Sequence, residues 1–185
     1  MYSVKQDLTD KKIGVILTDT IYGIVGLALE KDVVERVFRV KKRNPKKPLV
    51  VLISSIDDLK SIFEIDLNSK CLNILKEFWP GKVSVVLPCK KYPHLHRGLN
   101  SIAFRFPNKK ELVDLIKEVG PIIATSVNKE GEIPAKNITE AKECFKNELD
   151  FYIDGGEVSK EPSMIVRLVD ENELEVLRGK LCLRK

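Results

Sequence analysis

The chain contains no long apolar segment of the kind that a membrane span or a secretory signal requires. Its 185 residues include no run of about 18 apolar side chains, the length that a transmembrane helix needs. The N-terminal stretch MYSVKQDLTDKK is mostly polar or charged and has no apolar core. We therefore expect a cytoplasmic protein without a membrane partner.

Cysteine and histidine are scarce. Both histidines lie in the segment YPHLHRG at 92–98, and the four cysteines are Cys71, Cys89, Cys144 and Cys182. No two cysteines have C-x-x-C spacing, so reduced thiols are favoured over disulfides or a zinc site. The histidine segment is predicted to be a loop, and neither a metal site nor a Ser-His-Asp catalytic set is expected.

The glycine-rich motifs that commonly bind phosphate, G-x-x-x-x-G-K-[ST] and G-x-G-x-x-G, are also absent. Any bound phosphate is therefore expected to be held by side chains. The net charge of +5 and the pI near 8.9 permit an anionic partner such as a nucleotide or RNA. Aromatic residues make up only 6% of the chain, which is little for the aromatic platforms of RNA-binding modules.

Short apolar runs alternate with amphipathic segments along the whole chain. The apolar runs predict strands at 13–17, 49–53, 83–87, 102–106, 122–124, 151–153, 164–168 and 174–177. Amphipathic spacing predicts helices at 31–42, 56–63, 69–78 (capped by Ser69), 108–119 (capped by Asn108) and 139–145. This order predicts an α/β fold of the α+β type, a twisted mixed parallel and antiparallel sheet flanked by helices, in a single domain over residues 1–185.

Small polar side chains follow two of the predicted strands. The sequence TDT at 18–20 comes directly after IGVIL, and TSVN at 125–128 follows PIIA. Strand ends are where sheet proteins often collect ligand groups, and hydroxyl and amide groups there bind small polar ligands. The same residue types also form turns and helix caps. Both interpretations stay open for each cluster taken singly.

The segment KKRNPKKPL at 41–49 places five positive side chains within seven residues, just before an apolar run. Arg43 suits forked contacts with phosphate, whereas Lys41 and Lys47 suit neutralisation by single contacts. An anionic ligand and a solvated basic loop are both compatible with this segment.

Arg105 interrupts the apolar run IAFRF. A guanidinium in a buried strand is costly unless an opposite charge or a hydrogen-bond acceptor meets it. Arg105 is therefore a stronger candidate for a functional role than any exposed lysine.

Eight short motifs occur in an order and at spacings that are similar to those of one known family. They are LTDTIYGIVGLAL, KKRNPKKPLVVLI, FWPGKVSVVL, SIAFRFP, GPIIATSVNKEG, IDGGE, PSMIVRL and EVLRGK. Across about residues 10–180 they resemble the YrdC family, the threonylcarbamoyl-AMP synthases, in a short single-domain form. The resemblance implies a YrdC-like fold with a large basic cavity. It also implies that L-threonine, bicarbonate and ATP give threonylcarbamoyl-AMP, pyrophosphate and water.

The resemblance assigns roles to particular positions. The catalytic residues would be Lys41 and Arg43, the L-threonine ligands Thr20, Arg105, Ser126 and Ser163, and the ATP ligands Arg43, Lys47, Ser101, Asn128, Lys136 and Arg178. ATP would be a substrate accompanied by Mg²⁺, with no prosthetic group and no metal bound by the protein alone. The product would serve the modification of the adenosine next to the anticodon of tRNA. The implied partners are tRNA threonylcarbamoyl-transferase machinery and tRNA itself.

Three positions depart from the family pattern. Lys82 replaces the second proline of WPGPLT, Glu130 replaces the serine of SANxSG, and Leu52 stands where histidine is frequent. Two alternative functions therefore remain open. One is a paralogue similar to the YciO branch, which binds nucleotide without synthase activity, and the other is an RNA-binding module.

Overall fold

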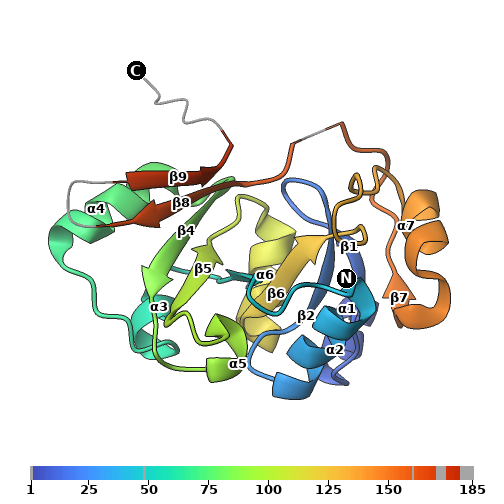
Figure 1. Ribbon diagram of the computed structural model, residues 1–185, viewed down its shortest axis with the longest axis horizontal. Helices are drawn as coiled ribbons and strands as arrows, with labels where there is room; N and C mark the ends of the chain where they lie inside the picture. The colour runs from blue at the N-terminus through green and yellow to red at the C-terminus, as the bar shows by residue number, and fades with distance from the viewer. Residues whose placement is uncertain (1, 48, 160, 170–173, 180–185) are drawn as a thin grey trace.

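In the part of the chain that the structure describes, nine strands form one mixed sheet, with helices on both of its faces (Figure 1). The computed structural model describes residues 2–47, 49–159, 161–169 and 174–179. The strands are β1 (Gly14–Leu17), β2 (Tyr22–Leu27), β3 (Val50–Leu52), β4 (Val83–Pro88), β5 (Ser101–Arg105), β6 (Ile122–Ser126), β7 (Phe151–Tyr152), β8 (Met164–Leu168) and β9 (Leu174–Arg178). The helices are α1 (Tyr2–Thr9), α2 (Lys31–Lys41), α3 (Asp57–Ser61), α4 (Ser69–Phe78), α5 (Pro93–His96), α6 (Lys110–Val119), α7 (Ile138–Phe145) and the 3₁₀ turn η1 (Lys146–Glu148).

The order of strands in the sheet is β7-β1-β2-β6-β3-β5-β4-β8-β9. β1 pairs antiparallel with β2, and β2 pairs antiparallel with β6. β3 and β5 run parallel, as do β4 and β8. The C-terminal hairpin β8–β9 therefore lies beside a strand from the middle of the chain (Figure 1). This arrangement confirms the predicted mixed sheet.

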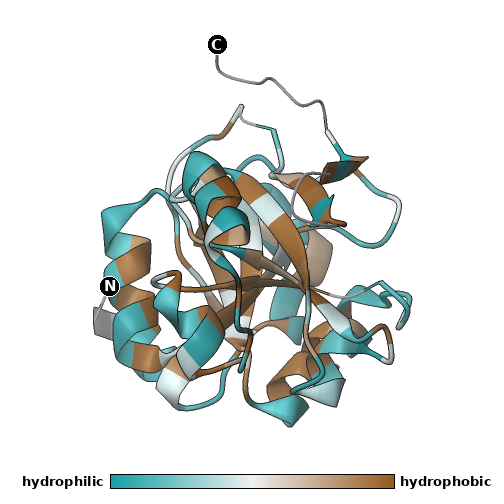
Figure 2. Ribbon diagram, turned by 90° about the vertical axis from the view of Figure 1, so that its left-hand side faces the viewer, coloured by the Kyte–Doolittle hydropathy of each residue, from teal (hydrophilic) through white to brown (hydrophobic). Residues whose placement is uncertain are grey.

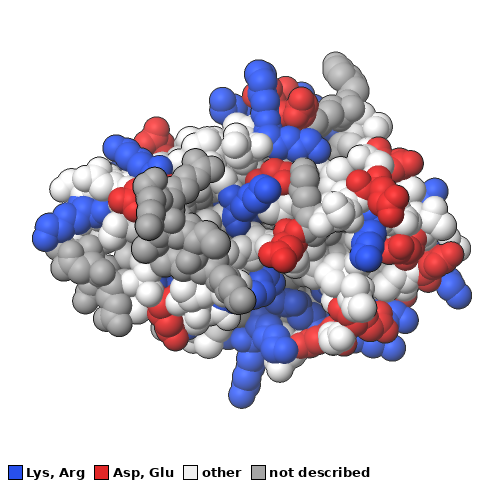
Figure 3. Space-filling view, turned by 90° about the horizontal axis from the view of Figure 1, so that it is seen from above, with Lys and Arg blue, Asp and Glu red and all other residues white. Residues whose placement is uncertain are grey.

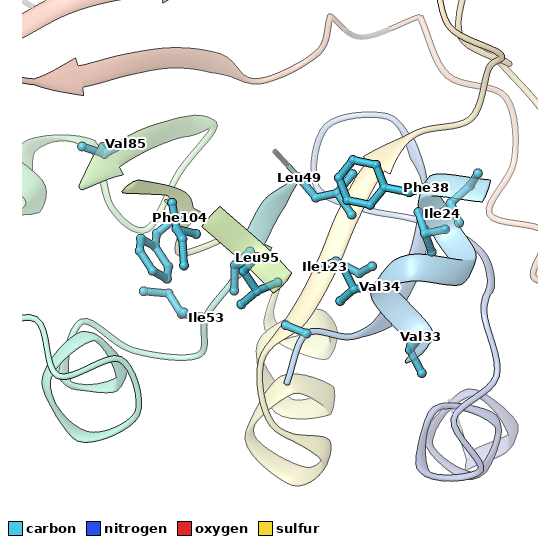
Figure 4. Close-up of a cluster of buried hydrophobic side chains, with 14 of the residues drawn as sticks. Ile24, Val33, Val34, Phe38, Leu49, Ile53, Val85, Leu95, Phe104 and Ile123 are labelled. Carbon is cyan, nitrogen blue, oxygen red and sulfur yellow. The ribbon is translucent and has the colours of Figure 1, made fainter. Parts of the chain in front are cut away.

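One face of the sheet carries the larger hydrophobic core. Val34 and Phe38 of α2 belong to the same buried cluster as Ile24 on β2 and Ile123 on β6 (Figure 4). The helical spacing of apolar residues in α2 places them on one side, which is why the helix packs on the sheet. The helices α3, α4, α5 and α7 extend this core through Leu59, Leu75, Leu95 and Phe145.

The opposite face has a second, smaller core under α1 and α6. Leu8 of α1 and Ile116 of α6 pack with Ile16 and Val25 of the sheet. Successive side chains of a strand point to opposite faces. Ile122 and Ala124 of β6 therefore lie on the same face. Ile122 is fully buried in this core, whereas Ala124 borders a cavity. The same face thus has a covered part and a hollow part.

Hydropathy follows this layering. Figure 2 shows apolar strands inside the molecule and helices whose outer sides are hydrophilic. In the part of the chain that the structure describes, no helix combines the length and the apolar character needed to cross a bilayer.

Three elements differ in kind from the sequence prediction. The strand β2 was not predicted, because YGIVGL contains two glycines and is buried on both faces, so no alternation is visible. The helix α1 was not predicted either, although Val4 and Leu8 lie one helical turn apart and are buried. The segment predicted as a histidine-containing loop contains the short helix α5.

Two predicted caps are wrong. The cap of α4 is Asn68, whose side chain accepts a hydrogen bond from the backbone N–H of Cys71 at 2.9 Å, and Ser69 is the first helical residue. The helix α6 begins at Lys110 without a side-chain cap. Asn108 instead donates its backbone N–H to Asp19 at 3.2 Å, which ties the start of α6 to the β1–β2 turn.

Candidate ligand-binding site

A cavity of about 610 Å³ opens over the hollow part of the sheet. This volume lies within the ~300–1,000 Å³ range of small-molecule sites. Its described lining contains no carboxylate but five cationic side chains, Arg43, Lys46, Lys47, Arg105 and Arg178, and we call it the basic cavity. Figure 3 shows Lys and Arg side chains gathered near the middle and the lower edge of this view. The cavity is suited to an anionic ligand.

Small residues on the sheet create the floor of the basic cavity. Gly23, Ala103 and Ala124 line it, whereas their strand neighbours Ile24 and Phe104 fill the core on the other face. A Cβ atom on Gly23 would lie 3.3 Å from Cγ2 of Thr18, closer than side chains normally pack. The contrast between small and large residues explains why this face is hollow where the other is filled.

Most of the residues that the family resemblance singled out meet in this cavity. The lining includes Thr20, Arg43, Lys47, Arg105, Ser126, Ser163 and Arg178. They come from the β1–β2 turn, the α2–β3 loop, β5, β6, the segment before β8, and β9. Sequence segments separated by more than a hundred residues therefore contribute to one site.

The arginines of the cavity are crowded and partly desolvated. Burial lowers the pKa of Arg43, and the charge of Arg178 lowers it further. Burial also lowers the pKa of Arg178, and Arg105 adds to the effect. Three positive charges thus influence one another across the same space. An anion placed among them would relieve this repulsion.

Arg105 forms a buried ion pair with Asp19, and the two side chains are each 4% exposed. Burial lowers the pKa of Arg105, whereas the carboxylate of Asp19 raises it. The Nε atom of Arg105 is buried and has no hydrogen-bond partner among the described residues. Asp19 is therefore the partner that the sequence predicted this arginine to need. One donor of the guanidinium, Nε, remains unsatisfied.

Lys41 lies beneath the site and does not line the cavity. Its side chain is 1% exposed, and Nζ donates to the carbonyl oxygens of Ser126 and Asn128, the latter at 2.7 Å. Nζ also contacts Oδ1 of Asn128 at 3.2 Å. Burial, with the nearby charge of Arg43, lowers the pKa of Lys41 to about 8. This lysine ties the end of α2 to the turn after β6.

A second network joins Ser163 to Arg178. Nη2 of Arg178 donates to the carbonyl oxygen of Ser163 at 2.8 Å and to its Oγ at 3.2 Å. The Oγ of Ser163 lies 3.1 Å from Oγ of Ser84, which is completely buried. The hydroxyl of Ser163 is therefore fixed from two sides at the cavity wall.

Thr20 is held by its own turn. Its backbone N–H donates to Oγ1 of Thr18 at 3.2 Å, and the two threonine hydroxyls lie 3.1 Å apart. Oγ1 of Thr18 donates to the carbonyl oxygen of Ile21 at 2.7 Å. The cluster TDT thus forms a turn, as one interpretation held, and also places a hydroxyl in the cavity lining, as the other held.

Four of the candidate positions lie outside the cavity lining. Besides Lys41, these are Ser101, which is two residues before Ala103 on the same face of β5, and Lys136, which is exposed. Asn128 is next to the site, where its Oδ1 accepts from Oγ of Ser126 at 2.6 Å. Lys41, Ser101 and Asn128 are therefore neighbours of the site rather than part of its wall, whereas no contact joins Lys136 to the cavity lining among the described residues.

Sequence reasoning missed several residues that shape the site. Asp19 is the partner that Arg105 required, and Ser84 is a polar residue within the apolar run VSVVL, which is a usable signal. The hydroxyl of Tyr22 donates to the carbonyl oxygen of Gly156 at 2.7 Å and accepts from the backbone N–H of Gly155 at 2.8 Å. It fixes the IDGGE segment, and nothing in the local sequence indicates that contact.

The described residues contain no group of three or more metal-ligating side chains placed to hold a metal ion. Cys71, Cys89 and Cys144 have free thiols, and Cys182 lies outside the described residues. Nδ1 of His96 accepts the backbone N–H groups of Gly98 and Asn100, at 3.1 and 3.3 Å.

Comparison with known proteins defines the class of this chain. Residues 6–179 match the Sua5/YciO/YrdC family, described as "Telomere recombination". The match extends over nearly the whole chain, and it includes every segment that contributes to the basic cavity. The chain belongs to this family.

Two curated relatives are named threonylcarbamoyl-AMP synthase. The Bacillus subtilis protein is 29% identical over 80% of this chain, and the Pyrococcus abyssi protein is 30% identical over 81%. The matched region is only 44% and 45% of those proteins, so the chain spans less than half of their length.

Two solved structures share the fold. The crystal structure of P. abyssi Sua5 complexed with L-threonine has a TM-score of 0.86 at 27% identity, covering 95% of this chain and 52% of that one. Escherichia coli YciO has a TM-score of 0.83 at 20% identity, covering 95% of this chain and 86% of that one. The second likeness concerns the fold alone.

Proposed function

We propose that this protein is an L-threonylcarbamoyladenylate synthase, an ATP-dependent nucleotidyltransferase that acts before tRNA modification. The observation that carries the proposal is the convergence of Thr20, Arg43, Arg105, Ser126 and Arg178 on one basic cavity. The fold that holds this cavity is similar to that of a protein crystallised with L-threonine, and curated relatives are named for this activity.

The proposed reaction needs positive charge more than it needs a base. L-Threonine and bicarbonate form a carbamate with loss of water. A carbamate oxygen then attacks the α-phosphorus of ATP, the bond to the β-phosphate oxygen breaks, and pyrophosphate leaves. The carbamate and ATP are both anionic, so a cavity lined by cations without carboxylates offsets their repulsion and stabilises the leaving group. Holding carbamate and phosphorus in line contributes on the order of 7 kcal/mol when orientation is good.

The geometry favours a division of the cavity between the two substrates. Arg43 and Lys47, from the α2–β3 loop, would neutralise the phosphates, with Arg178 on the nucleotide side. Arg105 and Thr20, which both line the cavity, would bind the carboxylate and another polar group of L-threonine. Mg²⁺ would be coordinated chiefly by the phosphates, because the described lining offers it no carboxylate.

The proposed contributions of the remaining candidates are less direct. Lys41 would keep Ser126 and Asn128 in place through its contacts with their carbonyl oxygens, and so would act on the reaction through them. Ser101 and Lys136 would reach nucleotide only if the ligand extends beyond the cavity lining. The tRNA and the transfer machinery would act on the product after its release.

A second candidate function is nucleotide binding without efficient synthesis, as proposed for a YciO-like paralogue. Glu130, which departs from the family pattern, favours this candidate, because it is ion-paired with Lys47 of the cavity. An RNA-binding module is less well supported, since Ser126 and Ser163 line the cavity together with its cationic side chains, and binding to a phosphate backbone would not need these hydroxyl groups.

The decisive assay is release of pyrophosphate from ATP that requires both L-threonine and bicarbonate, with the product identified by mass spectrometry. The Arg43→Ala variant should form no product while its circular dichroism remains unchanged. Arg39→Ala is the matched control, because Arg39 is an exposed arginine four residues earlier on α2. ATP binding without threonine-dependent product would support the YciO-like alternative, and unchanged turnover in Arg43→Ala would contradict the assignment.

A further inference from the structure

Glu130 brings a negative charge to the edge of the basic cavity, where the family pattern has serine. One of its carboxylate oxygens accepts the backbone N–H of Asn44 at 2.7 Å, and the other accepts Nζ of Lys47 at 2.6 Å. Lys47 also lines the cavity. A single carboxylate therefore joins the loop that carries the cavity's cations to the turn that follows β6.

The turn that carries Glu130 is ordered by its own contacts. The side-chain amide of Asn128 donates to the carbonyl oxygens of Lys129 and Glu132, at 2.9 and 2.8 Å. The backbone N–H of Glu132 donates back to Lys129 at 3.1 Å, which closes the turn. The carboxylate of Glu130 is thus presented from a defined position.

The loop opposite Glu130 is ordered in the same way. Nε of Arg43 donates to the carbonyl oxygen of Lys47 at 2.7 Å, and the backbone N–H of Lys47 donates to the carbonyl oxygen of Asn44 at 3.0 Å. This turn directs the backbone N–H of Asn44 and the ammonium of Lys47 at the same carboxylate, that of Glu130. A backbone N–H and an ammonium group that converge on an anion can equally donate hydrogen bonds to phosphate oxygens.

The charge of Glu130 interacts with cationic residues of the cavity. The hydrogen bond from Lys47, followed by that from Asn44, lowers the pKa of Glu130, and the carboxylate in turn raises the pKa of Arg43. At neutral pH a counter-charge is therefore already present at the edge of the cavity, on Glu130 beside Lys47. An incoming polyanion must displace this carboxylate from Lys47 or share the lysine with it.

We propose that Glu130 serves as an internal anion, which occupies part of the phosphate-binding donor set of the basic cavity and sets the affinity of the site for polyanionic ligands. This inference depends on the proposed function in one respect only, namely that phosphate groups bind in the cavity. Glu130 weakens the binding of a triphosphate because it competes for Lys47 and repels the ligand. The serine of the family pattern carries no charge and would do neither.

The test is the affinity of metal-free inorganic tripolyphosphate for the full chain, measured by calorimetry for the wild type and for Glu130→Gln. Glutamine keeps the size of the side chain, and its amide oxygen still accepts from Asn44. We expect the dissociation constant to fall about three- to fivefold at low ionic strength, the range of one exposed ion pair. The gain should shrink as salt is added.

Two further variants separate charge from structure. Glu132→Gln removes an exposed charge from the same turn, where the carboxylate lies 3.4 Å from the backbone N–H of Lys129, and should leave tripolyphosphate affinity unchanged. Glu130→Gln combined with Lys47→Gln should lose the gain of the single variant, because the gain depends on the released lysine. Melting temperatures of all variants report whether each remains folded.

An unchanged or weaker affinity in folded Glu130→Gln overturns the proposal, as does an equal gain in Glu132→Gln or the absence of any binding in both the wild type and Glu130→Gln. The synthase assay tests the proposed function independently of the tripolyphosphate measurement. Tighter tripolyphosphate binding without threonine-dependent product supports the role of Glu130 and contradicts the proposed function. Threonine-dependent product formation, combined with no effect of Glu130→Gln on tripolyphosphate affinity, supports the proposed function and contradicts the role of Glu130.

Discussion

At the scale of single residues, each arginine of the basic cavity is fixed by an acceptor on the protein. Arg105 meets Asp19, Arg178 meets the carbonyl oxygen of Ser163, and Arg43 meets that of Lys47. Side chains already held in place lose less conformational freedom when a ligand binds. The crowding of like charges is thus maintained by the fold in the absence of an anion.

Removing one partner of the buried ion pair between Asp19 and Arg105 should strongly lower the stability of the protein. Asp19→Asn leaves a buried guanidinium without its counter-charge, and we expect a loss of about 3 kcal/mol in the free energy of unfolding, measured by urea denaturation. Arg105→Leu should weaken L-threonine binding more than ATP binding. Because that change also strands Asp19, its effect on affinity is interpreted only in protein shown to be folded.

The exposed ion pair of Lys110 and Asp114, at 2.5 Å on α6, is the matched control for this experiment. Asp114→Asn should leave the free energy of unfolding nearly unchanged, because solvent screens exposed pairs. Equal effects of Asp19→Asn and Asp114→Asn would show that the buried pair has no special role.

Ser84 and Ser163 allow a prediction about a single proton. Ser84 is completely buried, and its hydroxyl has Ser163 as its partner among the described residues, so its proton is expected to point there. Oγ of Ser163 then accepts from both Ser84 and Arg178. A hydroxyl has two lone pairs and one proton. If Ser163 accepts both contacts, we expect its own proton to be available to an acceptor atom of a ligand in the basic cavity.

The matched variants Ser84→Thr and Ser84→Val have nearly the same shape and differ in the hydroxyl. We expect L-threonine affinity, measured by calorimetry, to be about three- to tenfold weaker in Ser84→Val than in Ser84→Thr, the range of one hydrogen bond. ATP affinity serves as the internal reference and should change less. Identical threonine affinity in the two variants would refute this assignment of the proton.

At the scale of elements, the buried lysine at the end of α2 links a helix to a distant turn. Nζ of Lys41 meets three acceptor oxygens of Ser126 and Asn128. Three acceptors match the three protons of an ammonium group. The turn after β6 thus has a fixed position relative to α2, although 85 residues separate Lys41 from Ser126.

This link should make stability depend on pH in the alkaline range. The folded pKa of Lys41, about 8, lies below its ordinary value of 10.5, so the unfolded chain holds more protons at this lysine between those two values. The free energy of unfolding should therefore rise with pH from about 8 to about 10.5, by at most about 3 kcal/mol from this group. Below pH 8 the lysine is charged in both states and contributes no slope.

The measurement is urea unfolding from pH 7 to 10 for the wild type and for Lys41→Met, with the difference in slope assigned to Lys41. A titration of the lysine by NMR in the wild type provides the check if Lys41→Met does not fold. A midpoint near 8 is expected, and a midpoint near 10.5 would contradict the account.

Elements with a clear period were predictable from the sequence. α2 and β8 have their predicted positions to within a residue, because α2 is amphipathic and β8 is an isolated apolar run bounded by polar residues. β2 was not predictable, since burial on both faces removes the alternation on which such predictions depend. The cap of α4 required a choice between the adjacent residues Asn68 and Ser69, both of which are good caps.

The candidate site was predictable in part. The need of Arg105 for a partner followed from physical chemistry, but the identity of Asp19 did not, because the two residues are 86 positions apart. The grouping of Thr20, Arg43 and Arg178 came from the family resemblance, since no local pattern relates a turn near the start of the chain to its last strand. Contacts between distant segments are what single-sequence reasoning lacks.

At the scale of the whole molecule, the order of strands explains why the cavity exists. β6 and β5 flank β3 at the centre of the sheet, and β8 and β9 extend it beyond β4. Their cavity-facing positions include Ala124, Ala103 and Val50 on the floor, with Ile165 and Arg178 toward the edge. Helices α1 and α6 cover the remainder of that face, and no helix among the described residues lines this part. The hollow is therefore a property of the topology. Its positive charge comes from the α2–β3 loop and from two strands, through Arg105 on β5 and Arg178 on β9.

We propose that the basic cavity holds an amino acid and a triphosphate side by side. The most direct test is a crystal structure of the protein with L-threonine and a non-hydrolysable ATP analogue. The account predicts both ligands in the basic cavity, with phosphate oxygens on Arg43 and the amino-acid carboxylate near Arg105. Ligands bound elsewhere, or a cavity that stays free of both at saturating concentrations, would contradict it.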